Sequence, residues 1–384
     1  MQLEILTYDQ RSASICKDYW LQDEEGKFVL KVQEIAVKYE MKAHIVSLYV
    51  KQHAYVWSVE ICCKRCEEPY HFRTRIHYQE RNRYKRSICQ KCSDAERENI
   101  ADQKRNIIVS LRQTAEVTKS DLAALDLKSI IYLLSVIQAL SNESLSAIDP
   151  LNDYPAYTLS PDPVFDRQII RYLLDKHLLL ISLDTSPKAV ELHGDGTASI
   201  NFMMSTFDFT LSQQQITELI HGFLDAEVLQ NITHSPGFIK LCKEIQLHEC
   251  LGFLKATLEE HKLSLSPGEK TLQVIRACLK NYSVAQVYNF IWRAARDAAA
   301  YYMRSAISKR QAANSVVGNI SRSLEQSLAN DWEVKPFSRN YNLPQSSLSR
   351  MVFNTLLGTD DGGFTKILHE LIRENNFSLD AGHV

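Results

Sequence analysis

The sequence predicts a mainly α protein of the α+β type that contains more than one domain. At 384 residues the chain is too long for a single core of ordinary size, so two to four compact units are expected. Apolar residues make up 45% and charged residues 23%, as in globular proteins, which argues against a disordered or fibrous chain. Apolar side chains recur at helical spacing through most of the sequence, and strand-like runs are short.

The sequence contains no pattern typical of membrane insertion or secretion. No run approaches the roughly 18 consecutive apolar residues of a spanning helix, and the longest lies near LLLISL. The start, MQLEILTYDQ, lacks the basic residues and apolar core of a secretory signal. We therefore expect a cytoplasmic protein that does not contact a membrane. Its nine cysteines would be reduced there, which disfavours a disulfide framework.

Residues 1–58 contain two runs with helical spacing on either side of a turn. Apolar side chains recur in residues 32–39 and again in 45–49. A small Ala36 suits the crossing of two helices, and Met41 fills the turn. These positions resemble the helix-turn-helix of DNA-binding proteins, which joins two short helices by a turn of three or four residues.

The resemblance implies that the second helix carries contacts to nucleic acid. Val46 and Tyr49 face inward, so the opposite face would enter a groove of DNA. Glu40 departs from the pattern, because the family usually has Gly there in a left-handed conformation. A helical hairpin without a binding role is the alternative. The residues expected to contact nucleic acid are Lys42, His44, Ser47 and Lys51.

Residues 59–100 hold the most specific pattern, two C-x2-C pairs about 22 residues apart. Each pair can bind one face of a tetrahedral ion, and Zn²⁺ favours a closed site of four thiolates. Such a site leaves no position for a substrate, so the zinc would be structural. We predict one zinc ion per chain. The predicted ligands are Cys63, Cys66, Cys89 and Cys92.

This module resembles the zinc-ribbon and treble-clef class, and no family covering the full length is identified. The resemblance implies small β-hairpins around the metal. It does not identify a partner, because the class binds DNA, RNA and protein alike. Cys62 offers a competing register with Cys66, and His71 or His77 are alternatives to one thiolate.

The cysteine module is also basic. Residues 61–92 contain nine Lys or Arg and three Glu, a net charge of +6, whereas the whole chain carries −2. Four thiolates and one Zn²⁺ add −2, so the loaded module stays near +4, which indicates an anionic partner. If residues 72–78 form a strand, alternation places Arg73 and Arg75 on one face. The cations expected to contact nucleic acid are Arg73, Arg75, Arg81, Arg83, Lys85 and Arg86.

Aromatic and imidazole rings alternate with these cations. A basic surface with exposed rings suits phosphate contacts combined with stacking on bases. The alternative is a solvated basic face whose aromatic rings form a miniature core. The rings concerned are Tyr70, His71, Phe72, His77, Tyr78 and Tyr84.

Residues 101–235 form the third predicted segment. A helix in residues 120–140 begins at a predicted cap, Ser120 with Asp121. A later helix runs into a strand, and a β-hairpin is expected around residues 193–196. The order of these elements resembles a winged helix in topology, without a diagnostic motif.

Residues 236–384 form a helical segment that we expect to bind a protein partner or to self-associate. Its strongest amphipathic helix lies within residues 284–310. A helix is also expected to begin at Ser346 or Ser347. Lys335, Arg339 and Arg350 would flank this helix start as an anion contact, and a plain exposed helix start is the alternative.

The function expected from these patterns is nucleic-acid binding without catalysis. The sequence contains no phosphate-binding glycine loop, nucleophile elbow or metalloprotease helix. DNA is favoured over RNA by the helix-turn-helix resemblance, in a regulatory, mobile-element or phage-defence setting. Two alternatives stay open: a protein–protein adaptor in which zinc only stabilises the fold, and a component of an enzyme or toxin system whose site is assembled from distant residues.

Overall fold

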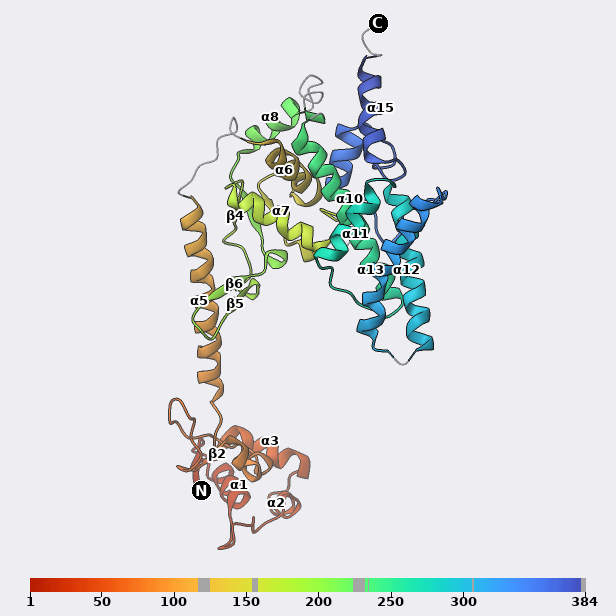
Figure 1. Cartoon of the computed structure of the whole chain (residues 1–384). Coiled ribbons are helices and arrows are strands. Elements are labelled where there is room, and N and C mark those ends of the chain that lie inside the picture. Colours follow the sequence, from red (N-terminus) through yellow and green to blue (C-terminus); the bar gives the residue numbers. More distant parts are fainter. Residues whose placement is uncertain (117–124, 154–157, 224–231, 234, 306, 381–384) are drawn as a thin grey trace. The chain divides into compact units, whose positions relative to one another are not determined.

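The computed structural model describes residues 1–116, 125–153, 158–223, 232–233, 235–305 and 307–380 (Figure 1). These residues are mainly helical with small antiparallel sheets, which confirms the predicted fold class. The cap predicted at Ser120 and Asp121 lies outside the described residues. Among the helices of the described ranges, none combines the length and apolar character needed to cross a membrane.

The chain divides into two compact units, residues 1–103 and residues 104–384. Helix α5 (Gln90–Glu116) contributes residues to both units. The four-part division expected from the sequence stays a prediction.

The N-terminal unit combines helices with one two-stranded sheet. The first strand pairs antiparallel with the second, from Gln2 opposite Trp57 to Ile5 opposite Ala54. Asp9 caps the first helix by accepting a hydrogen bond from the N–H of Ser12. The elements before α5 are β1 (Gln2–Ile5), α1 (Gln10–Trp20), α2 (Val32–Lys38), α3 (Ala43–His53), β2 (Ala54–Trp57), α4 (Arg75–Gln79) and η1 (Arg81–Tyr84).

One core joins the helices of this unit to the cysteine module. Trp20 of α1 and Val46 of α3 belong to the same buried cluster as Ile61, Phe72 and Tyr78 of the module. All five side chains are buried. The module therefore folds against the helices and not as a separate body.

Helix α2 ends in a Schellman motif at the turn before α3. Met41 N–H donates to the carbonyl of Ala36 at 2.9 Å, and Glu40 N–H donates to the carbonyl of Val37 at 3.3 Å. Glu40 has φ 52°, the left-handed conformation that the sequence pattern requires at this position. The two helices and their turn are thus present, while a DNA-binding role for them stays a prediction.

The first half of the C-terminal unit contains a three-stranded antiparallel sheet of order β3-β7-β4. The predicted hairpin around residues 193–196 is confirmed, since β5 pairs antiparallel with β6. The elements are α6 (Leu127–Leu140), β3 (Ala147–Ile148), η3 (Leu151–Asp153), α7 (Pro163–Asp175), β4 (Leu179–Ile181), η4 (Pro187–Ala189), β5 (Val190–Leu192), β6 (Ala198–Ile200), η5 (Phe202–Met204), β7 (Phe207–Phe209) and α8 (Gln213–Phe223).

The second half of this unit is helical. Ser283 and Ser308 start two long helices with capping boxes, each closed by a Gln at the third helical position. Ser346 accepts a hydrogen bond from Ser349 N–H, which confirms the predicted helix start. The elements are α10 (Pro236–Glu260), α11 (Glu269–Leu279), α12 (Val284–Arg304), α13 (Lys309–Ala329), α14 (Ser347–Ser349), the π-helical η6 (Arg350–Leu356) and α15 (Leu368–Asp380).

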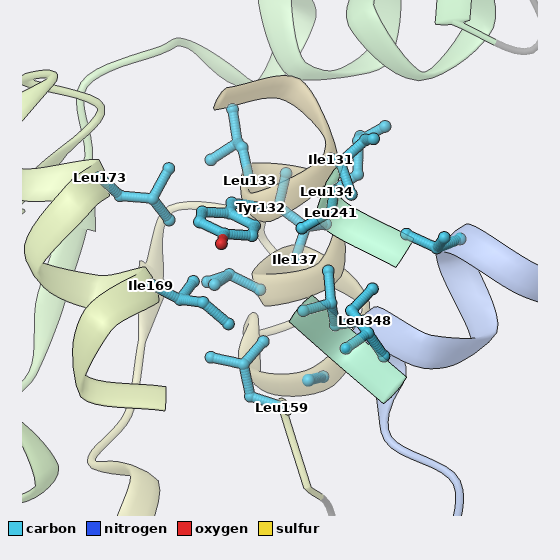
Figure 2. Close-up of a cluster of buried hydrophobic side chains, with 14 of the residues drawn as sticks. Ile131, Tyr132, Leu133, Leu134, Ile137, Leu159, Ile169, Leu173, Leu241 and Leu348 are labelled. Carbon is cyan, nitrogen blue, oxygen red and sulfur yellow. The ribbon is translucent and has the colours of Figure 1, made fainter. Parts of the chain in front are cut away.

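Two large cores share helix α10. Its first half, including Leu241, packs with α6, α7 and the C-terminal elements α14, η6 and α15. Figure 2 shows Ile131, Ile169 and Leu348 in this core. Its second half, including Leu254, packs with α11, α12 and α13. Residues far apart in sequence therefore form one continuous packed unit around α10.

A buried ion pair fixes the segment before α14. Arg339 Nη1 donates to Glu249 Oε1 at 3.3 Å, and the hydroxyl of Ser349 donates to the same oxygen at 2.9 Å. The Arg339 guanidinium also lies over the ring of Phe364. Arg339 is thus half-buried and paired with the buried Glu249, which corrects the expectation that it flanks an exposed anion contact.

Candidate metal centre and basic surface

Two segments far apart in sequence bring four cysteine thiols together. Cys63 and Cys66 lie on a tight turn after β2, where the N–H of Glu67 donates to the carbonyl of Cys63 at 3.0 Å. Cys89 directly precedes α5, and Cys92 lies in the first turn of that helix. The four sulfur atoms lie within 4.8 Å of one another. The four predicted ligands therefore form one cluster that could hold a metal ion.

The spacing of the sulfur atoms fits a tetrahedral ion. Cys66 Sγ lies 3.7 Å from Cys89 Sγ. In a tetrahedral site with metal–sulfur bonds of about 2.3 Å, the sulfur atoms are about 3.8 Å apart. The two values agree for this pair, and all four sulfur atoms lie within 4.8 Å of one another, so the cluster is compact enough to hold a metal ion.

Backbone N–H groups point at these sulfur atoms. Cys63 Sγ accepts hydrogen bonds from the N–H of Cys89 at 3.2 Å and of Arg65 at 3.4 Å. Cys89 Sγ accepts one from Cys92 N–H at 3.4 Å. The bond from Cys89 N–H is the main cause that lowers the pKa of Cys63 to about 6. The donors to Cys63 favour its thiolate, the form that binds metals, whereas burial raises the pKa of Cys92.

The alternative ligands lie elsewhere. The Cys62 thiol donates to the carbonyl of Val59 at 3.2 Å. His71 stacks on Tyr55 with ring centroids 4.1 Å apart, and His77 lies in α4. Within the part of the chain that the structure describes, the cluster at this site consists of cysteines alone.

The β structure around the cluster is smaller than the resemblance implies. It consists of single antiparallel bridges, Val56 with Phe72 and Cys62 with Pro69, that continue from β2. The possible strand over residues 72–78 does not form, because the Thr74 side chain caps α4 by accepting from His77 N–H. Residues 75–79 are therefore helical, and alternation does not place Arg73 and Arg75 on one face.

Most aromatic rings of the module face inward. Phe72 packs edge-to-face against Tyr78 and Tyr84, and Tyr70 packs against Tyr84. Phe72 and Tyr78 are buried, and the other two rings pack against the same core. These four rings form the miniature core, as a module this small requires, and are not available for stacking on bases.

Arg75 is part of that interior. Its Nε donates to the carbonyl of Tyr19 and its Nη1 to the carbonyl of Leu30, both at 2.7 Å. The guanidinium also lies against the rings of Tyr19 and Phe28. Burial lowers the pKa of this guanidinium. Arg75 therefore ties α1 to the module and does not belong to the exposed basic surface.

Arg73 lies at the junction of the module and α3. Its Nη1 donates to the carbonyl of Lys51 at 3.0 Å, in the last turn of α3, while the residue stays exposed. The guanidinium also lies 6.0 Å from the ring of Tyr55, which stacks on His71. Tyr55 was not among the predicted contact residues. It lies in the short strand AYVW, where alternation puts its side chain on the face opposite the buried Ala54 and Val56.

The remaining predicted cations differ in exposure. Arg81 is half-buried over the ring of Tyr78 and donates to its carbonyl at 3.1 Å. Arg83 is exposed and forms an ion pair with Glu80 at 3.0 Å. Lys85 and Arg86 are exposed. Arg83, Lys85 and Arg86 thus form a short cationic run on the surface before Cys89.

The predicted contact residues of α3 lie on its outer side. Lys42 precedes the helix, and His44 and Lys51 are exposed, whereas Ser47 is half-buried. His44, Ser47 and Lys51 are spaced three and four residues apart, so they share one face, which lies beside the face of the buried Val46 and Val50. We name the exposed set the basic surface; it consists of Lys42, His44, Lys51, Arg73, Arg83, Lys85 and Arg86.

Comparison with known proteins does not identify a family. No protein-family model, no curated protein and no solved structure matches this chain.

Proposed function

We propose that this chain is a cytoplasmic, non-enzymatic DNA-binding protein whose N-terminal unit binds duplex DNA through the basic surface, organised by one structural zinc ion. The observation that carries the proposal is the shared core of the unit. Because Val46 of α3 and Phe72 of the module are buried in one cluster, the helix face and the cationic loop are held as one surface.

Zinc is the metal that this donor set favours. Four thiolates in tetrahedral arrangement are typical of structural zinc sites, whereas hard cations prefer oxygen ligands. One pair lies on a tight turn and the other at the start of α5, an arrangement similar to that of treble-clef domains. All four ligand positions come from the chain, so the ion stabilises the unit and offers no position for a substrate.

DNA is the partner that the basic surface fits. Lysine and arginine side chains contact phosphates, and the surface places Arg73 beside Lys51 at the end of α3. The face of α3 that carries the exposed His44 and Lys51 and the half-buried Ser47 has the composition of a helix that contacts a groove. Single-stranded nucleic acid fits less well, because the rings of Phe72, Tyr78 and Tyr84 are occupied in the core.

The C-terminal unit supports this reading through its small sheet. The order β3-β7-β4, with the hairpin β5–β6 inserted between β4 and β7, is the strand order of a winged helix. We propose that residues 125–223 form a winged-helix-like body, a fold that recurs in DNA-associated proteins. Its sheet packs against residues of α5 through Ile108, and Arg112 forms an ion pair with Asp208.

The proposal is tested by binding of the zinc-loaded chain to a random-sequence DNA duplex across a salt series, with single-stranded RNA in parallel. The logarithm of the affinity falls with the logarithm of salt at a slope of about −0.9 for each neutralised phosphate. The variant reverses four exposed cations of the basic surface. Its substitutions are Lys51→Glu, Arg83→Glu, Lys85→Glu and Arg86→Glu.

We expect this variant to bind more weakly and to flatten the salt slope by about 2 to 4. A matched control reverses four exposed cations of the C-terminal unit and should keep the slope of the parent chain. If the parent chain binds neither nucleic acid at low salt, the proposal is wrong and the adaptor alternative takes its place. The control substitutions are Lys270→Glu, Lys309→Glu, Arg310→Glu and Arg322→Glu.

A further inference from the structure

The C-terminal unit contains a large groove with a volume of about 1080 Å³. Its walls come from α7, α10, α11 and α15. The lining is mostly apolar and includes half-buried side chains from each of three helices and the segments beside them. These half-buried side chains are Ile239, Leu265, Leu272, Leu279, Ile367 and Ile372.

Helix α10 runs along the groove from end to end. Lining residues recur every four positions from Ile239 to Lys255, and a second row recurs every four positions from Lys240 to Gly252. Rows four residues apart lie on one face of a helix. At a rise of 1.5 Å per residue, the 16 steps from Ile239 to Lys255 extend over about 24 Å.

The rim of the groove is basic. Six lysine or arginine side chains line it, all exposed, against two acidic residues, Asp162 and Glu244. Lys255 and Arg276 make ion pairs with Glu259 and Glu269, at 3.9 Å and 3.5 Å. Among the residues that the structure describes, the other four form no ion pair. The six cations are Arg167, Lys240, Lys243, Lys255, Arg276 and Lys280.

One wall is fixed by a buried polar pair. His248 Nδ1 and a carboxylate oxygen of Asp162 are hydrogen-bonded, and the other oxygen of Asp162 accepts from Val164 N–H and Phe165 N–H at the start of α7. The imidazole also stacks on Phe165. Gly252 leaves room for the carbonyl of Pro161, which would lie only 2.8 Å from an added Cβ. The groove is therefore preformed where α7 meets α10.

We infer that this groove binds an acidic amphipathic helix supplied by a protein partner. An apolar floor with a cationic rim is complementary to a helix with one apolar stripe and acidic residues beside it. The cations extend along α10 from Lys240 to Lys255, about 22 Å, which is longer than a single anionic head group requires. Duplex DNA matches the rim but offers no apolar stripe for Leu272 and Leu279.

The inference is tested with a fluorescein-labelled synthetic peptide of about 16 residues, the length of the groove. Its Leu residues occupy one helical stripe and Glu most other positions, and a scrambled peptide of identical composition is the control. We expect the zinc-loaded full chain to bind the striped peptide with micromolar affinity and the scrambled peptide at least about tenfold more weakly. Fluorescence anisotropy measures both.

Two variants of the full chain locate the binding. Replacement of Lys240, Lys243 and Lys280 by Glu should weaken the affinity for the striped peptide at least about tenfold, because three attractive charges become repulsive. Reversal of Lys309, Arg310 and Lys335, exposed cations outside the groove, should leave its affinity unchanged. The four-residue variant of the basic surface should also bind the peptide normally, which separates this inference from DNA binding.

Three outcomes would overturn the inference. The first is no binding of the striped peptide, and the second is equal binding of striped and scrambled peptides or of parent chain and groove variant. The third is displacement of the peptide by a DNA duplex in the variant that lacks the basic surface, since the groove would then be a phosphate-binding site.

Discussion

At the scale of single residues, Asp166 shows how burial sets a charge state. Its carboxylate accepts hydrogen bonds from Ser160 N–H at 2.8 Å and from the Ser160 hydroxyl at 2.6 Å. Burial nevertheless raises the pKa of Asp166 to about 6. The desolvation of the charged form outweighs the two donors.

This pKa predicts a pH dependence of stability. Between pH of about 4 and 6 the folded chain holds the Asp166 proton that the unfolded chain has released, so the free energy of unfolding falls as pH rises. Asn cannot ionise, so the free energy of unfolding of Asp166→Asn should not fall in this way. The variant should be more stable than the parent by about 1–3 kcal/mol at pH of about 7 and similar to it near pH 4. Urea unfolding of both chains checks this; a difference that does not change with pH would contradict the assignment.

Glu40 provides a second prediction at this scale. A left-handed conformation costs a residue with a side chain about 1–2 kcal/mol, and Gly avoids that cost while losing more conformational entropy on folding. Glu40→Gly should therefore raise the free energy of unfolding by about 0.5–1 kcal/mol. Glu40→Ile should lower it, because a β-branched residue is strained at φ 52°. Equal losses in both variants would mean that the Glu40 side chain itself stabilises the turn.

Arginine residues mark the limit of prediction from the sequence. Arg73, Arg75 and Arg81 lie in the same basic stretch of the sequence, yet of these three only Arg73 is exposed. Arg75 is held by the carbonyls of Tyr19 and Leu30, which lie more than forty positions away in the chain. No local spacing encodes such a contact, since it depends on how α1 packs against the module.

At the scale of elements, periodicity and caps could be read from the sequence. The helix pair around Glu40, the hairpin after residue 189 and the helix that starts after Ser346 follow from apolar spacing, turn residues and a serine cap. Helix α4 was missed because RIHYQ after Thr74 also alternates like a strand. The groove was missed because α10 and α15 are brought together only by tertiary packing.

The first turn of α5 carries a prediction at the element scale. Cys89→Ser with Cys92→Ser removes one of the two ligand pairs, so zinc content should fall from about one ion per chain to none. Because structural zinc contributes directly to folding, amide hydrogens of β2, α4 and the turn at Cys63 should exchange faster, while those of α10 and α12 stay protected. Elemental analysis and hydrogen exchange measure the two effects.

The natural control for that variant is Cys62→Ser. Cys62 lies beside the cluster and donates to a backbone carbonyl, but it is not one of the four clustered thiols. Zinc content and exchange rates should stay those of the parent chain. Zinc retained by the double variant, or lost from Cys62→Ser, would contradict the ligand assignment.

At the scale of the whole molecule, the division at residue 103 separates two proposed tasks. The N-terminal unit holds the cysteine cluster and the basic surface, and the C-terminal unit holds the groove. The sequence pointed to the first task, because cysteine spacing and charge are local properties. For the second it predicted only that residues 236–384 bind a protein partner or self-associate. The groove itself could not be predicted, because it is assembled from residues 162 to 372.

The most direct test of the central claim is DNA binding by one sample before chelation, after removal of zinc, and after zinc is restored. If the metal organises the basic surface, duplex affinity should fall on chelation and return as zinc reaches about one ion per chain. The striped peptide should bind the protein in all three states, because the groove lies in the C-terminal unit. DNA affinity that is unchanged in the zinc-free protein would contradict the account.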